Sequence, residues 1–203
     1  RDYVAAFLLR PYDVRPSLPA MMPRLDLSAA EAEQIARTLV PSQQTVPPRG
    51  DSENGRALFG SFGCGRCHFF SGAALAPPVP FPMSLSTEKL QEAIALAPDL
   101  RFARERFQPG ALTAWLRSPK TQKPDTLMPS FSLSEQDAED LATYVLTTPL
   151  APLPSLVVPQ RLPLLSRRVS FDEVNAQVFR KTCWHCHSTA AYAKGDGGPG
   201  NTG

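Results

Sequence analysis

The chain repeats one pattern of apolar and polar positions, first near its start and again near residue 130. Each copy opens with a Met-Pro pair, at Met22 and at Met128, and then reaches a serine that is followed three positions later by an acidic residue. That spacing is typical of a capping box at the start of a helix. Apolar residues then recur with helical period, at Ala32, Ile35, Ala36 and Leu39 and at Ala138, Leu141, Ala142 and Val145. The pattern predicts two amphipathic helices.

Other segments repeat as well. Residues 3–11 match residues 111–119, and both end in proline. Short helices are predicted over Ser52–Phe62 and Val174–Lys181, each running into a cysteine motif. The second is expected to be opened by Ser170 with Glu173 three positions later. A further helix is predicted around Thr87–Ala97.

Proline is unusually frequent, with 22 residues, and many lie in two clusters at 41–48 and 149–163. Such stretches favour extended, semi-rigid linkers. We therefore divide the chain at these clusters. The predicted parts are the C-terminal half of a domain (1–45), a complete domain (46–148), a Pro-rich linker (149–168) and the N-terminal half of a further domain (169–203).

Both cysteine motifs are Cys-x-x-Cys-His pentapeptides, at residues 64–68 and 183–187, and together they contain all four cysteines. This spacing is the attachment signature of a c-type haem. The two thiols form thioethers with the haem vinyl groups, and the adjacent histidine binds the iron. The residues in these roles are Cys64, Cys67 and His68 at the first site and Cys183, Cys186 and His187 at the second. The chain is therefore expected to carry two haem c groups.

A Cys-x-x-Cys pair also occurs as half of a zinc site, as a redox dithiol or as a disulfide. Zinc ribbons usually place their second pair much closer than Cys67 is to Cys183. A thioredoxin-like dithiol follows a β-strand, and no β-rich stretch precedes either motif. None of these alternatives explains a histidine directly after both pairs, so the haem interpretation is favoured.

Only three histidines occur: His68, His185 and His187. His185 lies inside its own attachment loop and cannot reach the distal face of that haem. The distal ligand is therefore expected to be a methionine sulfur, unless the position is open. His/Met ligation raises the reduction potential, which favours a carrier of relatively high potential.

These features resemble the class I cytochrome c family, and nearly the whole chain takes part in the resemblance. The implied fold class is all-α, with tandem class I cytochrome c-like haem domains joined by Pro-rich linkers. In residues 46–148, Gly55 resembles the glycine at which the N-terminal helix of that family crosses the C-terminal helix, here carrying Leu141 and Tyr144. Elementary sterics agree, because two backbones approach more closely where no Cβ intervenes.

The resemblance also implies roles around the haem. Pro98 resembles the proline whose carbonyl accepts a hydrogen bond from the proximal imidazole, and Pro77 is a rival for this role. Arg106 and Trp115 resemble residues that hold the haem propionates. Met128 resembles the distal ligand of the iron.

Some of these residues have plainer interpretations. Met128 could be a core methionine, but the repeat, the proline that follows and the shortage of histidines favour the ligand role. The arginines of residues 101–106 could form a solvated charged face. Met22 aligns with Met128 and is preferred over Met21 as a ligand of a second haem, whereas Met83 is expected at the surface or in packing.

Length and charge limit the function classes. A chain of 203 residues suits about two domains, and a formal charge of +2 argues against a nucleic-acid partner. No run of about 18 apolar residues occurs, so no transmembrane helix is expected, and no signal peptide is visible. Because bacteria attach haem c outside the cytoplasm, we expect a periplasmic or otherwise extracytoplasmic protein, whose leader was removed or which is an internal piece of a longer chain.

The expected function is electron transfer between redox proteins, one of which could be a membrane-bound respiratory or photosynthetic complex. The alternatives are a dihaem peroxidase-like enzyme with an open site at the second haem, and an electron-input module of a larger redox complex. The half domains at 1–45 and 169–203 are each near the lower limit for independent folding. Three arrangements remain open: a longer multihaem protein with a further haem upstream, one split domain formed by both halves, or self-association through the halves. In residues 169–203, Asn175 stands where the resembled family usually has the glycine of the helix crossing.

Overall fold

The computed structural model describes residues 1–11, 14–17, 22–40, 46–74, 85–152, 160, 163 and 165–183. Throughout these ranges every regular element is helical, which agrees with the predicted all-α class. The chain divides into two compact units, Arg1–Pro159 and Gln160–Gly203. In the described ranges no helix is both long and apolar enough to cross a lipid bilayer. The tandem arrangement, the domain limits and the linkers stay predictions.

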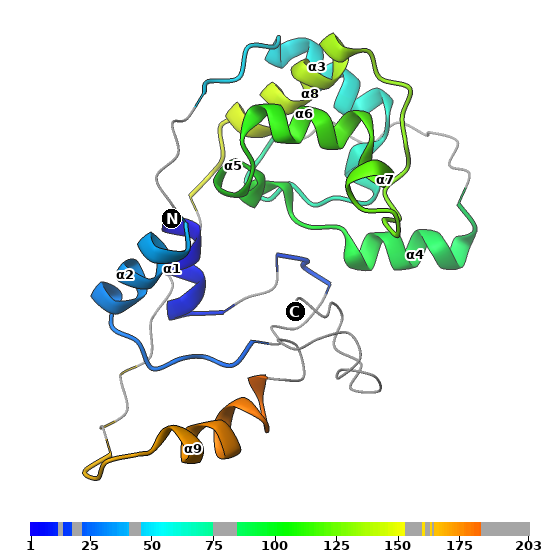
Figure 1. Cartoon of the computed structure of the whole chain (residues 1–203). Helices are drawn as coiled ribbons and strands as arrows, with labels where there is room; N and C mark the ends of the chain where they lie inside the picture. Colours follow the sequence, from blue (N-terminus) through cyan, green and yellow to red (C-terminus); the bar gives the residue numbers. More distant parts are fainter. Residues whose placement is uncertain are drawn as a thin grey trace. The chain divides into compact units, whose positions relative to one another are not determined.

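Two helices of the first unit cross in close contact: α3 (Ser52–Ser61) and α8 (Glu135–Thr147), which lie side by side with α6 (Pro109–Arg117) (Figure 1). Gly55 lies at the crossing, where a Cβ would come within 2.0 Å of the Asp140 carbonyl oxygen and 2.8 Å of the Tyr144 Cβ. Only a glycine allows the two backbones to approach this closely. The predicted close crossing is therefore confirmed.

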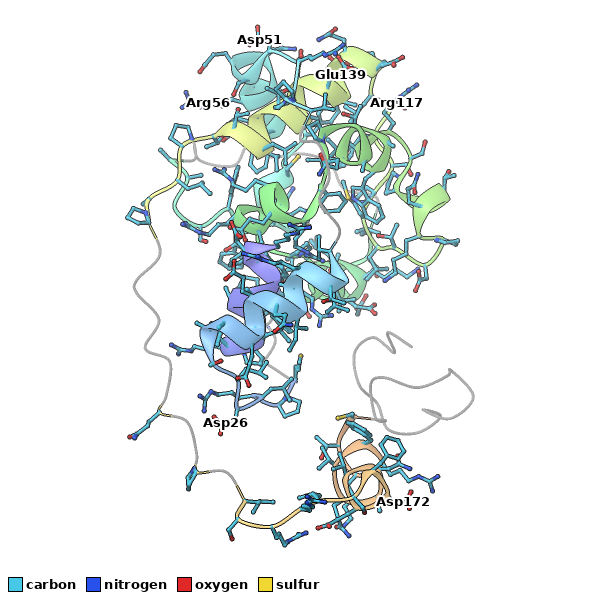
Figure 2. All side chains as sticks on the ribbon, turned by 60° about the vertical axis from the view of Figure 1, so that its left-hand side comes forward. Asp26, Asp51, Arg56, Arg117, Glu139 and Asp172 are labelled. Atoms are coloured by element: carbon cyan, nitrogen blue, oxygen red, sulfur yellow. The ribbon has the colours of Figure 1, made fainter. Side chains whose placement is uncertain are left out.

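Hydrogen bonds join the N-terminal end of α3 to α8. Asp51 is the N-cap of α3, and its carboxylate accepts bonds from the amides of Glu53 and Asn54. Its own amide donates to Oδ1 of the buried Asp140 at 2.7 Å, while the Asn54 side chain donates to Oδ2 at 2.6 Å. Asp51 and Glu139 mark this end of the helix pair in Figure 2.

Side chains of both crossing helices contribute to the hydrophobic core of the domain. Tyr144 of α8 contacts Phe59 of α3 at 5.4 Å and Phe70 at 5.9 Å between ring centroids. Helix α6 (Pro109–Arg117) begins with proline at its first turn and packs on α8, with Leu112 buried in the same cluster. These contacts join segments that are far apart in the sequence.

Shorter elements complete the domain. They are η1 (Cys64–Arg66), α4 (Thr87–Leu96), η2 (Leu100–Phe102), α5 (Ala103–Arg106) and α7 (Pro119–Gln122). Ser86 caps α4 by accepting a bond from the Lys89 amide, and the helix predicted around Thr87–Ala97 is confirmed. The helix predicted over Ser52–Phe62 is confirmed as α3.

Helices α1 (Asp2–Leu9) and α2 (Ala29–Leu39) pack against each other. Both predicted capping boxes are present, with Ser28 and Glu31 opening α2 and Ser134 and Asp137 opening α8. The two amphipathic helices predicted from the repeat are therefore confirmed. Leu8, Ala32 and Ala36 are buried.

The second unit contains α9 (Phe171–Val174), which continues into one π-helical turn, η3 (Asn175–Phe179). The sequence predicted a helix over Val174–Lys181, and this start is wrong. Ser170 is the N-cap and accepts a bond from the Glu173 amide, so the helix begins at Phe171.

Candidate haem site

The first cysteine motif follows the end of α3 in a tight turn. Gly63 has a φ of 63°, in the left-handed region that favours glycine, and it leads into η1. The amides of Cys67 and His68 then both donate to the Cys64 carbonyl, at 3.3 Å and 3.0 Å. This local folding places both thiols and the imidazole on one turn.

His68 has a defined tautomer. Its Nδ1 lies 2.9 Å from the Pro98 carbonyl oxygen, which can only accept, so Nδ1 carries the proton and donates it. Burial lowers the pKa of His68, although the Pro98 bond and the charge of Asp99 act to raise it. The imidazole is therefore neutral near pH 7, with the lone pair of Nε2 available to a metal.

The two thiols beside His68 are free, not joined in a disulfide. Burial raises the pKa of Cys64 to about 12, and the proximity of Cys67 acts in the same direction against a backbone hydrogen bond. Burial also raises the pKa of Cys67, against the charge of Arg66. Until a haem is attached, both sulfurs are therefore thiols and not thiolates at neutral pH.

Two residues with different predicted haem roles, Trp115 for a propionate and Met128 as the distal ligand, contact each other. The indole Nε1–H of Trp115 donates to the Met128 sulfur at 3.0 Å. The amide of Met128 donates to the Thr126 hydroxyl at 3.2 Å, and the side chain of Met128 is half-buried. The structure thus brings His68 to Pro98 and Trp115 to Met128.

Comparison with known proteins gives one match. Residues 52–149 match the family model for cytochrome c. These residues form a cytochrome c domain. No curated protein and no solved structure matches the chain. The match covers the first cysteine motif and Met128, and it ends before the second motif.

A cytochrome c domain binds haem c covalently and takes part in electron transfer, and the residues present fit that group. The donor set is a neutral imidazole with Nδ1 already engaged, two free thiols on the same turn and a thioether within the domain. Cys64, Cys67 and His68 would hold the haem, and Met128 is the predicted distal thioether. These individual assignments stay predictions.

The position of the imidazole acceptor agrees with the resemblance. Pro98 accepts the bond from His68, whereas its rival Pro77 lies outside the described residues. Arg106 is exposed, and its guanidinium carbon lies 5.7 Å from the centroid of the Tyr3 ring. The propionate roles of Arg106 and Trp115 stay predictions.

Two arginines near Arg106 bind backbone carbonyls, whereas a solvated charged face would leave them to water. Arg101 donates through Nη1 to the Ser71 carbonyl at 3.0 Å, and Arg104 donates through Nη2 to the Thr148 carbonyl at 2.8 Å. The interpretation as a solvated face is therefore wrong for these two side chains. Their carbonyl partners are far away in the sequence, so no local pattern predicts these hydrogen bonds.

The second motif lies largely outside the described residues, which end at Cys183. Its other predicted haem residues, Cys186 and His187, are therefore not placed. Met22 is described and half-buried in a bend before α2, while Met21 and Met83 lie outside the described residues. The second haem and its ligands stay predictions.

Proposed function

We propose that this chain is an electron carrier with two covalent haem c groups, the first of them in the cytochrome c domain with His68 and Met128 as axial ligands. The hydrogen bond from His68 Nδ1 to Pro98 carries this proposal. It leaves the opposite ring nitrogen free to bind iron, next to two thiols at attachment spacing.

His68 and Met128 would each supply one ligand to the haem iron. Bound haem iron supplies a one-electron couple between Fe(III) and Fe(II). His68 is held as the Nδ1–H tautomer, and the Pro98 bond increases its donor strength. Met128 contributes a soft sulfur, which favours Fe(II) and raises the potential. If His68 and Met128 both bound the iron, they would leave no coordination site for a substrate.

The second haem is proposed on Cys183 and Cys186 with His187 as proximal ligand. Met22, which corresponds to Met128 in the repeat, is the proposed thioether for this haem. Two haems on one chain suit a relay between redox proteins outside the cytoplasm, with weak and transient contacts of the kind that redox partners usually make. A membrane-bound redox complex is one such partner.

Substitution of Met128 by alanine tests the axial assignment. We expect the haem to stay attached through its thioethers, while the Fe(II)/Fe(III) equilibrium shifts at least tenfold toward Fe(III), about 59 mV for one electron. Cyanide should then bind readily to the iron. Redox titration and cyanide binding of the full chain measure both effects.

The variant Met83→Ala is the control, because no ligand role is proposed for Met83. It should leave the potential and the cyanide affinity as in the wild type. A Met128→Ala protein with unchanged potential and unchanged cyanide binding would exclude Met128 as the axial ligand. Rapid reaction of the wild-type chain with peroxide at one haem would instead favour the peroxidase-like alternative.

A further inference from the structure

The Pro98 carbonyl, which accepts the hydrogen bond from His68, belongs to a short connection between two helices. Pro98 lies between the end of α4 at Leu96 and the start of η2 at Leu100. Proline has no amide proton with which to anchor itself. The position of its carbonyl therefore depends on the residues that follow it.

Asp99, the next residue, is almost completely buried, with 7% of its surface exposed. Its Oδ1 accepts bonds from the amides of Ser71 at 3.0 Å and Arg101 at 2.9 Å. Its Oδ2 accepts a bond from the Ser71 hydroxyl at 2.5 Å. One carboxylate thus joins the segment that follows His68 to the segment that follows Pro98.

Further bonds run between the same two segments. The Leu100 amide donates to the Phe69 carbonyl at 2.9 Å, and Arg101 Nη1 donates to the Ser71 carbonyl. Gly72 ends the first segment with a φ of 82°, and a Cβ there would lie 2.5 Å from Arg101 Nη1. Backbone and side-chain bonds thus pair the segment after His68 with the segment after Pro98.

The amide of Asp99 has a partner as well, since it donates to the Val14 carbonyl at 2.7 Å. The residue is thus held through its backbone by the N-terminal segment and through its side chain by Ser71. The Asp99 amide belongs to the same peptide unit as the Pro98 oxygen that accepts the hydrogen bond from His68, and the carboxylate is attached to the next Cα through its Cβ.

We propose that Asp99 is a positioning residue for the proximal ligand, because its carboxylate, bound to Ser71 and Arg101, holds the Pro98 carbonyl against Nδ1 of His68. This inference rests on the proposed function in one respect, namely that His68 binds the haem iron. It adds an outer partner that sets the donor strength of the imidazole and hence the potential.

Three variants of the full haem-containing chain separate position from charge. Asp99→Ala removes all three side-chain bonds. Asp99→Asn removes the charge but keeps an oxygen that can accept from the two amides. Ser71→Ala removes only the hydroxyl bond. Asp140→Ala is the matched control, because Asp140 is also buried and also accepts three bonds, but it joins α3 to α8.

Two readouts report on the His68 bond: the solvent exchange of its Nδ1 proton, followed by NMR in the reduced chain, and the reduction potential. In Asp99→Ala we expect exchange to be at least tenfold faster and the potential to rise, since a weaker hydrogen bond makes imidazole a poorer donor to Fe(III). In Asp99→Asn the potential should rise, while exchange stays within about threefold of the wild type. Ser71→Ala should speed exchange by an intermediate factor, and Asp140→Ala should change neither readout.

Unchanged exchange in Asp99→Ala would overturn the proposal, because loss of the charge alone can raise the potential. Equal acceleration of exchange in Asp140→Ala would also overturn it, because the effect would then be general loosening. If Asp99→Ala fails to mature, Ser71→Ala decides, and exchange at the wild-type rate in that variant would count against the positioning role. If the wild-type chain carries covalent haem but the variants do not behave as expected, only the role of Asp99 is refuted. If the wild-type chain carries no haem, the proposed function is refuted as well.

Discussion

Gly55 and Asp140 lie in direct backbone contact, and a Cβ on Gly55 would come within 2.0 Å of the Asp140 carbonyl oxygen. The contact joins the helix that leads into the haem motif to the helix that follows Met128 in the chain. The glycine thus fixes the distance between the helix before the first cysteine motif and the helix after Met128.

Gly55→Ala is expected to destabilise the domain by about 3 kcal/mol, the upper part of the usual range for overpacking. The two nearest atoms belong to the backbone of Asp140, so they cannot move aside as the end of a flexible side chain could. Gly60 on the same helix has nothing within 4 Å of its virtual Cβ, and Gly60→Ala should be neutral or stabilising by up to about 1 kcal/mol. Denaturant unfolding compares the two variants, and equal stability of both would contradict the close crossing.

The capping box of α8 predicts a smaller effect. The Ser134 hydroxyl accepts from the Asp137 amide at 3.0 Å and donates to the Asp137 carboxylate at 2.7 Å. Ser134→Ala should therefore cost about 1 kcal/mol of unfolding free energy. Ser130, exposed and upstream of the helix, is the control, and Ser130→Ala should change stability by less than about 0.5 kcal/mol. A Ser134→Ala protein as stable as this control would argue against the cap.

The pKa of Asp140 predicts a dependence of stability on acid. Burial acts to raise this pKa, but hydrogen bonds from the Asn54 side chain, the Asp51 amide and the Gln136 side chain outweigh burial and hold it below the ordinary value. The unfolded chain then takes up the proton at a higher pH than the folded chain does. The stabilisation is complete above the unfolded pKa of about 3.9 and is lost as the pH falls through the folded pKa.

Asp140→Asn should remove this component. The unfolding free energy of the wild type should fall more steeply between about pH 5 and pH 2 than that of the variant, measured by chemical denaturation at each pH. Near neutral pH the variant should be less stable by about 1–3 kcal/mol, because donors then face an amide that cannot satisfy them all. Parallel curves for the two proteins would show that Asp140 does not contribute to acid unfolding.

Trp115 predicts an effect on access to the iron. Its indole donates to the sulfur of Met128, and this contact limits the motion of the proposed ligand. Trp115→Phe keeps most of the ring but removes the donor. Cyanide should therefore bind several-fold faster to the oxidised variant than to the wild type in stopped-flow mixing. An unchanged rate would mean that the indole does not restrain Met128.

The helices were predictable where their signals are local. Ser28 with Glu31 and Ser134 with Asp137 open their helices as the capping-box spacing predicts, and the apolar residues that follow include the buried faces. Gly55 was predictable for a different reason, since the resemblance to a family supplied the partner helix that local pattern alone does not name.

Long-range polar contacts were not predictable. Ser71 and Asp99 are 28 positions apart, and neither residue belongs to a periodic pattern that would pair them. Arg101 and Arg104 have the appearance of solvated surface charges in sequence, yet both bind carbonyls that only the fold brings near. The predicted start of α9 at Val174 was too late. A helix begins directly after its N-cap, so Ser170 places the start at Phe171.

Intact mass and peptide mapping of the matured full chain test the central claim most directly. We predict that the chain carries the mass of two haems, one on the peptide with Cys64 and Cys67 and one on the peptide with Cys183 and Cys186. The substitution of both Cys64 and Cys67 by serine should remove only the first. A matured wild-type chain in which Cys64 and Cys67 carry no haem would contradict the account.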